Sequence, residues 1–298
     1  MSVAEAEAKT RAVEGQAGLW SDAFDRLKRN PGAVAGSIVV VLFVIVAVFA
    51  PLVAPYDPNE QVGSLAANPE GPSGEHWFGL DEQGRDFFSR VVYGSRLSLL
   101  TGVVSVAIGL LFGVALGALA GYLGGWVDTV IMRFMDIMLS IPGLLLAIAI
   151  VTATGRGLLP IMLAIGIINV PVFARLLRGS ILAQREADYV LAARSLGATG
   201  PRLLGVHILP NAIAPVNVQA TLAMGTAIIE VAALSFLGLG PADPGFPEWG
   251  KMVADNSNRL TVSTHLIFFP GFAIVLSVLG INLIGDGLRE AIDPKLRA

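Results

Sequence analysis

The chain contains no cysteine and only three histidines among its 298 residues. Without cysteine, a disulfide framework and a thiolate metal site are both excluded. The histidines, His76, His207 and His265, do not have metal-ligand spacing, and the sequence lacks both an HExxH helix and a GxSxG nucleophile elbow. We therefore expect no metal site and no catalytic residues, and we do not expect the chain to be an enzyme.

Charged residues are also scarce. They make up 14% of the chain, whereas a soluble domain has about a quarter. Hydrophobic residues make up 54%, which places the chain in the membrane class. The net charge of −3 gives no overall positive field that would attract nucleic acid.

Six stretches are long, apolar and almost free of charge, as helices that cross a bilayer must be. We therefore expect an all-α polytopic membrane protein with six transmembrane helices. The predicted spans cover about residues 33–54, 97–121, 131–153, 158–178, 208–231 and 266–286. An even number of spans puts both termini on one side of the membrane. If that side is cytoplasmic, the inner segments contain 14 lysines and arginines and the outer segments 6, so both termini are predicted to be cytoplasmic.

Residues 1–30 precede the first span and mix acidic with basic residues, unlike a signal peptide. We expect residues 1–18 to be a flexible tail and residues 19–29 to be an amphipathic helix that ends at Asn30-Pro31. Such a helix either lies on the membrane surface or caps the first span, and the sequence leaves both open.

Glycine recurs at every fourth position of the second predicted span, at Gly109, Gly113, Gly117 and Gly121. Small residues at this spacing allow another helix to approach closely. The approaching helix belongs either to the same subunit or to a partner subunit, and both interpretations fit the pattern.

The segment from Gly245 to Lys251 has the glycine and lysine spacing of a phosphate-binding loop. Met252 stands where the hydroxyl that holds magnesium is needed, and Pro247 removes a backbone donor. The predicted topology also puts this segment outside the cell. We therefore expect the chain not to hydrolyse nucleotide itself.

Ionisable residues of the spans lie near the span ends. Arg133 and Asp136 are three residues apart, where they can form a pair, and Asp128, Glu230 and Asp286 also lie near the membrane interfaces. A proton relay would place carboxylates at the bilayer centre, so ion pairs that fix helix ends are favoured. An ion-coupled secondary transporter that depends on Asp136 stays open as the alternative.

The long inner segment of residues 176–207 contains helix formers without a breaker from Arg185 to Leu196. Gly197 is a predicted helix stop, and Thr199-Gly-Pro201 suits the start of a second helix. The side chains on the exposed side of the first helix are expected to be small, because Ala192 and Ala193 lie there, next to the glycine. Such a side suits the groove of another protein, although a surface loop without a partner fits equally well.

The run EADYVLAARSLGATGPRLLGVHILPN resembles the signature loop of binding-protein-dependent ABC importer permeases. The family pattern is E-A-A, three residues, Gly, nine residues, then I-x-L-P. The positions that keep this pattern are Ala192, Ala193, Gly197, Leu209 and Pro210, while Leu191 and His207 replace the leading Glu and Ile. These departures resemble the dipeptide/oligopeptide/nickel branch, as do the stretches FGLDEQGRDFFSRVVYGSRLSL, LSFLGLGPADPGFPEWGKM and GINLIGDGLREAIDPKLR. The start RLKRNPGAV resembles the C-type (DppC/OppC) subunit of that branch.

This resemblance implies the type I importer permease (MetI-like) fold over residues 31–298. The chain would be a transmembrane subunit of an ATP-driven importer and would form half of a pathway for dipeptides, oligopeptides or a related ligand. Nickel, glutathione and haem importers of the same branch are the alternatives.

The resemblance also implies partners in a bacterial inner membrane. They are a homologous second permease (DppB/OppB-type), two ATPases (DppD/DppF-type) that bind ATP and magnesium, an extracytoplasmic solute-binding protein (DppA-type) and membrane lipid, with no cofactor in this chain and no nucleic acid. The coupling loop, about residues 183–207, would contact one ATPase. The residues assigned to this contact are Glu186, Asp188, Tyr189, Ala192, Ala193, Arg194, Gly197 and Pro210.

Overall fold

The computed structural model describes residues 19–65 and 69–292. The predicted flexible tail, residues 1–18, lies outside this part of the chain. Most of the described residues are helical. Two isolated β-bridges are also present among them, one between Gln61 and Arg85 and one between Leu80 and Asp86. Of the helices described, 5 are long and apolar enough to cross a membrane, and a bent pair can provide a sixth crossing.

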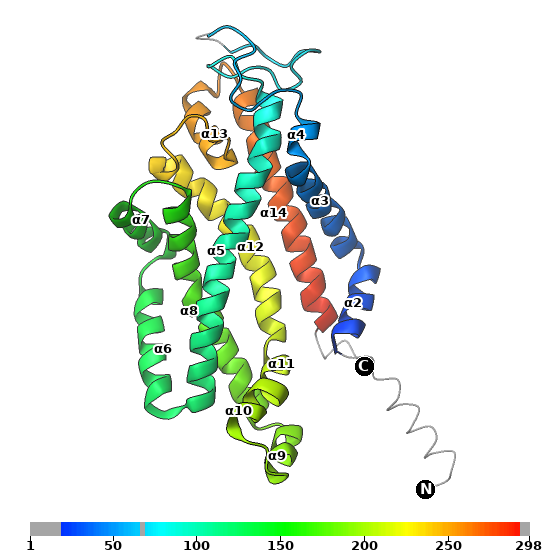
Figure 1. The fold of residues 1–298 in the computed structure, drawn as a ribbon, viewed down its shortest axis with the longest axis vertical. Helices are drawn as coiled ribbons and strands as arrows, with labels where there is room; N and C mark the ends of the chain where they lie inside the picture. Colours follow the sequence, from blue (N-terminus) through cyan, green and yellow to red (C-terminus); the bar gives the residue numbers. More distant parts are fainter. Residues whose placement is uncertain (1–18, 66–68, 293–298) are drawn as a thin grey trace, which may run out of the picture.

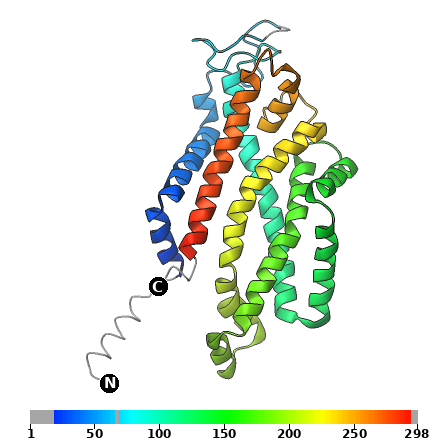
Figure 2. The same ribbon diagram turned by 180° about the vertical axis from the view of Figure 1, so that it is seen from behind.

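The helices up to α8 are α2 (Leu19–Arg29), α3 (Pro31–Val48), α4 (Ala50–Val53), α5 (Phe87–Leu123), α6 (Gly125–Ser140), α7 (Gly143–Thr154) and α8 (Leu158–Arg185). They are followed by α9 (Asp188–Ser195), α10 (Gly200–Arg202), η1 (Leu203–Ile208), α11 (Leu209–Ala212), α12 (Ala214–Leu234), η2 (Ser235–Leu239), α13 (Trp249–Asn256), η3 (Ser257–Arg259) and α14 (His265–Ile292). Figures 1 and 2 show the long helices side by side in an elongated bundle. One end carries α9 and α10. The other end carries α13 and the loops around it, and we call residues 54–65, 69–86 and 240–264 the cap.

The predicted third span, residues 131–153, is not one straight helix. The axes of α6 and α7 meet at 92°. Pro142 disfavours helical geometry in the residue before it, and Ile141 is extended, with φ −96° and ψ 130°. Figure 1 shows α6 alongside α8, with α7 turned aside near the start of α8. The continuous apolar run through this proline made an unbroken helix the simpler expectation.

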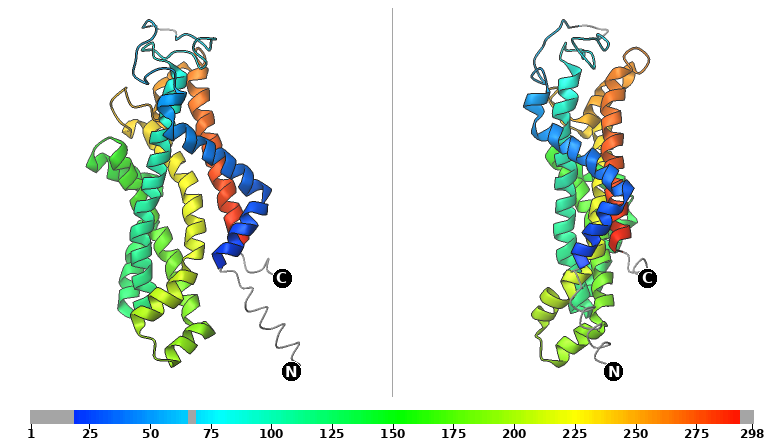
Figure 3. Two further views of the ribbon diagram at one scale, coloured as in Figure 1. Left: turned by 45° about the vertical axis from the view of Figure 1, so that its right-hand side comes forward. Right: turned by 90° about the vertical axis from the view of Figure 1, so that its right-hand side faces the viewer.

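The first two helices, α2 and α3, are joined tightly at Asn30. The Asn30 side chain caps α3 by accepting a hydrogen bond from the backbone N–H of Ala33 at 3.0 Å, and Pro31 occupies the first turn, where no N–H is needed. The Asn30 amide also donates to Glu290 of α14 at 2.7 Å. Figure 3 shows α2 against the end of α14 as well as below α3, so this helix contacts both helices at this end of the bundle.

Helix α5 begins at Phe87, well before the predicted span at residue 97. Its 37 residues give a length of about 55 Å, which exceeds the roughly 30 Å of a hydrocarbon core. Asp86 caps its first turn, because Oδ2 accepts hydrogen bonds from the Ser89 N–H at 2.8 Å and the Ser89 hydroxyl at 2.7 Å. A single helix therefore extends from the cap to the end of the bundle that carries α9.

The four spaced glycines of α5 all face α8 of the same chain. A Cβ atom built on Gly113 would lie 2.5 Å from Phe173 Cβ and 2.9 Å from the Val170 carbonyl oxygen. A Cβ on Gly117 would lie 2.9 Å from Ala174 Cα. These residues leave no room for a side chain on α5, so the glycine pattern serves packing within the subunit.

We predict that Gly113→Ala destabilises the fold by about 1–3 kcal/mol, because the added methyl overlaps Phe173 and the backbone of α8. The thermal unfolding midpoint of the detergent-solubilised protein measures this loss. Gly271→Ala is the matched control, since Gly271 also lies inside a helix but a Cβ there meets nothing within 4 Å. An equal midpoint for the two variants would contradict the close contact of α5 with α8.

Candidate coupling site

The segment between α8 and α12 has a break that the sequence did not predict. Helix α8 ends at Arg185, and Ala187 is extended, with φ −73° and ψ 142°, before α9 begins at Asp188. Of the expected helix from Arg185 to Leu196, residues 188–195 form α9, and a corner at Glu186-Ala187 separates them from the end of α8. This corner turns α9 across the end of the bundle (Figure 1).

Gly197 ends α9 as the sequence predicts. Its φ is +85°, a left-handed conformation in which a side chain is unfavourable. The Ala198 N–H donates to the Ala193 carbonyl at 3.1 Å and the Gly197 N–H donates to the Arg194 carbonyl at 3.0 Å. This paired arrangement is a Schellman motif, and it fixes the direction in which the chain leaves α9.

The inward side of α9 is anchored by Val190, which is fully buried. It belongs to one hydrophobic cluster with Leu177 and Ile181 of α8 and Leu203 and Ile208 of η1. Ala193 packs against the same cluster. Of the two alanines expected on the exposed side, only Ala192 is exposed, because the corner before α9 turns Ala193 toward the bundle.

The outward side of α9 is larger and more apolar than the sequence suggested. Leu196, beside the stop glycine, is 89% exposed, and Tyr189 and Leu191 are also exposed. The remaining predicted contact residues that are exposed are Glu186, Asp188, Ala192, Arg194, Gly197 and Pro210. The outward face is thus an apolar surface that ends in Leu196 and is bordered by charged groups.

Polar contacts attach the segment between α8 and α12, which we call the coupling segment, to the rest of the bundle. The Tyr189 hydroxyl donates to Gln184 Oε1 at 2.5 Å, and Asn211 donates to the His207 carbonyl at 3.0 Å. Arg185 Nη1 donates to the carbonyl oxygens of Gly121 at 3.1 Å and Tyr122 at 3.2 Å, at the end of α5. A cation at a helix C-terminus satisfies carbonyls that lack partners within the helix, so Arg185 fastens α5 to the base of α9.

The ionisable residues of the third span form pairs different from the expected one. Asp136 pairs with Arg175 of α8 at 2.6 Å, instead of with Arg133. Asp128 accepts two hydrogen bonds from Arg178, one of them at 2.6 Å from Nη2. Helix α6 lies alongside α8 and runs antiparallel to it (Figure 1), which brings these carboxylates opposite arginines that are distant in sequence.

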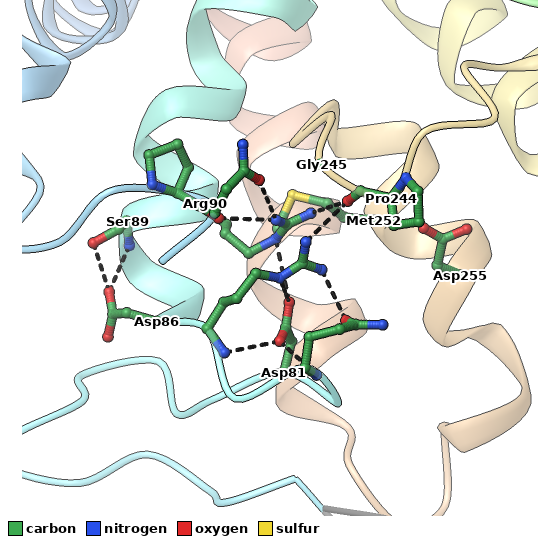
Figure 4. A network of polar contacts seen from close by, with 12 residues as sticks. Asp81, Asp86, Ser89, Arg90, Pro244, Gly245, Met252 and Asp255 are labelled. Carbon is green, nitrogen blue, oxygen red and sulfur yellow. Dashed lines mark hydrogen bonds and ion pairs between the residues drawn. The ribbon is translucent and has the colours of Figure 1, made fainter. Parts of the chain in front are cut away.

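A second polar cluster lies in the cap, around two buried arginines (Figure 4). Arg85 Nε donates to Asp81 Oδ2 at 2.7 Å. Arg90 Nη1 donates to the Pro58 carbonyl at 2.9 Å, and Arg85 Nη1 and Arg90 Nη2 both donate to the Pro244 carbonyl at 3.1 Å. Three cap segments far apart in the sequence are therefore held on the first turn of α5.

The glycine-lysine segment that resembled a phosphate loop has its backbone donors occupied. Glu248 is buried and caps α13, with Oε1 accepting from the Gly250 N–H and Oε2 from the Lys251 N–H, both at 2.8 Å. A phosphate would need these same donors. Among the residues described, no group of three acidic or histidine side chains could hold a metal ion.

Residues 113–298 match the family described as the binding-protein-dependent transport system inner membrane component. Residues 18–72 match the N-terminal transmembrane domain of oligopeptide transport permease C. The first match covers well over half of the chain. The chain belongs to this permease family.

Curated relatives align with almost the whole length of this permease. The dipeptide transport system permease protein DppC of Alkalihalophilus pseudofirmus is 49% identical over 94% of this chain and 91% of the relative. The glutathione transport system permease protein GsiD of Pectobacterium atrosepticum is 43% identical over 94% of this chain and 92% of the relative. This permease is therefore a transmembrane subunit of an ABC importer.

Solved structures support the fold of the permease. An inward-facing MetNI methionine ABC transporter matches with a TM-score of 0.55 and 20% identity, over 68% of this chain and 96% of that one. An amino acid ABC transporter crystallised with histidines matches with a TM-score of 0.53 and 18% identity, over 68% of this chain and 95% of that one. Together with the all-helical bundle, these likenesses show the type I importer permease fold.

Several residues that matter in the permease site were not singled out in the sequence. Arg185 was counted only as an inner-side charge, and Tyr122 was not considered, although its hydroxyl lies against Gly200. Leu196 was noted only as a helix position. The sequence feature that could have indicated the exposure of Leu196 is its position directly before the glycine that ends the helix, because the last residue of a helix at such a stop can project from the surface.

We predict that Arg90→Gln loosens the cap at a cost of about 1–3 kcal/mol, because the Pro58 carbonyl loses its arginine donor and the Pro244 carbonyl keeps only the hydrogen bond from Arg85. Limited proteolysis of the loop at residues 241–246 should become several-fold faster than in the wild type. Arg156→Gln is the control, since Arg156 is an exposed arginine of another loop. Arg90→Lys should be intermediate, because lysine keeps the charge but not the planar fork. Equal proteolysis of all four proteins would contradict this role of Arg90.

Proposed function

We propose that the outward face of α9 binds one cytoplasmic ATPase, with Leu196 as the central contact. The observation that carries this proposal is an apolar residue that is 89% exposed at the end of a helix whose other side is fully anchored. A few residues that fill pockets on the partner dominate binding at most interfaces, and an exposed aliphatic side chain can be such an anchor. The anchored side of α9 allows a movement imposed on Leu196 to pass into α8 and α5.

The proposed orientation puts α9 and both termini in the cytoplasm and the cap outside a bacterial inner membrane. The excess of lysine and arginine in the inner segments supports this orientation. The cap would then face a solute-binding protein of the DppA type. A second permease of the DppB/OppB type would complete the pathway, and ATPases of the DppD/DppF type would bind ATP and magnesium, with no cofactor in this chain.

The proposed cargo is a short peptide. Relatives named for dipeptide and glutathione transport support this class, since glutathione is itself a tripeptide. Glutathione is the second candidate, supported by a relative of 43% identity. An ion-coupled mechanism is less well supported, because Asp136, on which it would depend, is paired with Arg175.

We predict that Leu196→Asp weakens ATPase binding by roughly 30-fold or more, which corresponds to about 2 kcal/mol for an interface anchor. Leu196 is almost fully exposed, so the substitution should leave the fold of the subunit intact. Co-purification of ATPase subunits with the permease measures the loss. Uptake of a labelled dipeptide, competed with unlabelled dipeptide or glutathione, measures its consequence and the cargo class.

The matched control is Leu260→Asp, which places the same charge on an exposed leucine of the cap. It should retain the ATPase subunits. Normal co-purification and uptake with Leu196→Asp would refute the proposed docking face. Competition by neither peptide in a functional transporter would refute the proposed cargo alone.

A further inference from the structure

One side of α3 packs against the bundle and the opposite side is left open. A Cβ built on Gly36 would lie 2.5 Å from the Gly280 carbonyl oxygen of α14, so α3 and α14 approach closely through glycine. On the other side, the large apolar residues Ile38, Val41, Leu42 and Ile45 are exposed. The open side of α3 is therefore an apolar surface with no covering helix among the described residues.

Helix α2 turns this surface into a groove. A cavity of about 490 Å³ lies between α2 and α3 and is lined by apolar side chains from both helices, together with Ser37 and Lys28. The Ser37 hydroxyl donates to the Ala33 carbonyl at 2.7 Å, which satisfies it within its own helix. Lys28, which is exposed, is thus the charged residue of the lining, and the rest of the groove suits a hydrocarbon.

The length of the groove matches one leaflet of a bilayer. The lining residues of α3 run from Val34 to Ile45, which is about 17 Å along the helix. The hydrocarbon core is about 30 Å thick, so half of it is about 15 Å. A groove of this length that starts near Asn30 at the helix end accommodates one acyl chain of the adjacent leaflet.

The open end of the groove is positively charged. Arg26, Lys28 and Arg29 all lie in the last turn of α2, and the Lys28 ammonium lies 4.2 Å from the centre of the Phe24 ring. On the far side of α2, Arg26 and Arg29 line a separate cavity with Glu290. No carboxylate of the described residues forms an ion pair with Lys28, so the charge at the groove is complementary to an anion.

We propose that the groove between α2 and α3 binds one anionic phospholipid, with an acyl chain along α3 and the phosphate at Lys28. The apolar lining accounts for the chain, and the lysine accounts for selection of an anionic headgroup. A basic residue near a membrane surface favours anionic lipid by about fivefold. This binding depends neither on the proposed cargo nor on ATPase docking.

The absence of cysteine allows a direct test. Val41→Cys, labelled with bimane, places a single fluorophore in the groove of the assembled transporter, once its partner subunits are also free of reactive thiols. The transporter is reconstituted in phosphatidylcholine vesicles that contain increasing fractions of brominated phosphatidylglycerol or brominated phosphatidylcholine. We expect half-maximal quenching at an about fivefold lower fraction of the anionic lipid, and near-equal fractions in the Lys28→Gln background.

Arg289→Gln is the control for charge, because Arg289 lies in the last turn of α14 and is exposed. It should keep the preference for the anionic lipid. Ile45→Cys provides a second label position in the same groove if Val41→Cys fails to assemble. Equal quenching by both lipids, or a preference that survives Lys28→Gln, would overturn the headgroup assignment. Protection of both label positions from both lipids would show that a protein helix covers the groove and would overturn the lipid proposal.

Discussion

The close contact of α5 with α8 is the constraint on which the arrangement of this permease depends. Glycines at four-residue intervals bring the two backbones so near that a single methyl at Gly113 would overlap Phe173. This proximity places the end of α5 beside Arg185, which donates to the Gly121 and Tyr122 carbonyls. The coupling segment starts at this point, so its position follows from glycine packing inside the bundle.

The same helix connects the two functional ends of the subunit. At one end, Arg90 holds separate cap segments through the Pro58 and Pro244 carbonyls. At the other end, Arg185 holds the base of α9. A continuous helix of about 55 Å lies between them, with Asp86 capping its start. If an ATPase binds α9 as proposed, its movement would have a continuous helical path to the cap through α5.

Local sequence pattern was sufficient for much of this fold. The apolar stretches, the helix over residues 19–29 and the stop at Gly197 follow from composition, periodicity and backbone preference. The Asp136–Arg175 pair and the partial burial of Ala193 were missed, because each depends on contacts between helices distant in sequence. The bend at Ile141-Pro142 had a local signal in the proline, but the continuous apolar run favoured an unbroken helix. The glycine pattern predicted close packing, but only the structure shows that α8 is the partner. In the coupling site, the helix was predictable and its outward face was not.

The two kinds of contact at the coupling segment suit different tasks. Its internal attachments are directional hydrogen bonds from Arg185 and Tyr189, together with the fully buried Val190, and these resist relative movement. Its outward face is apolar around Leu196, so the proposed contact with a partner would be governed by burial of surface, which has little directional preference. A contact of this kind would tolerate rotation of the partner, whereas the attachments behind it would pass the displacement on to α5 and α8.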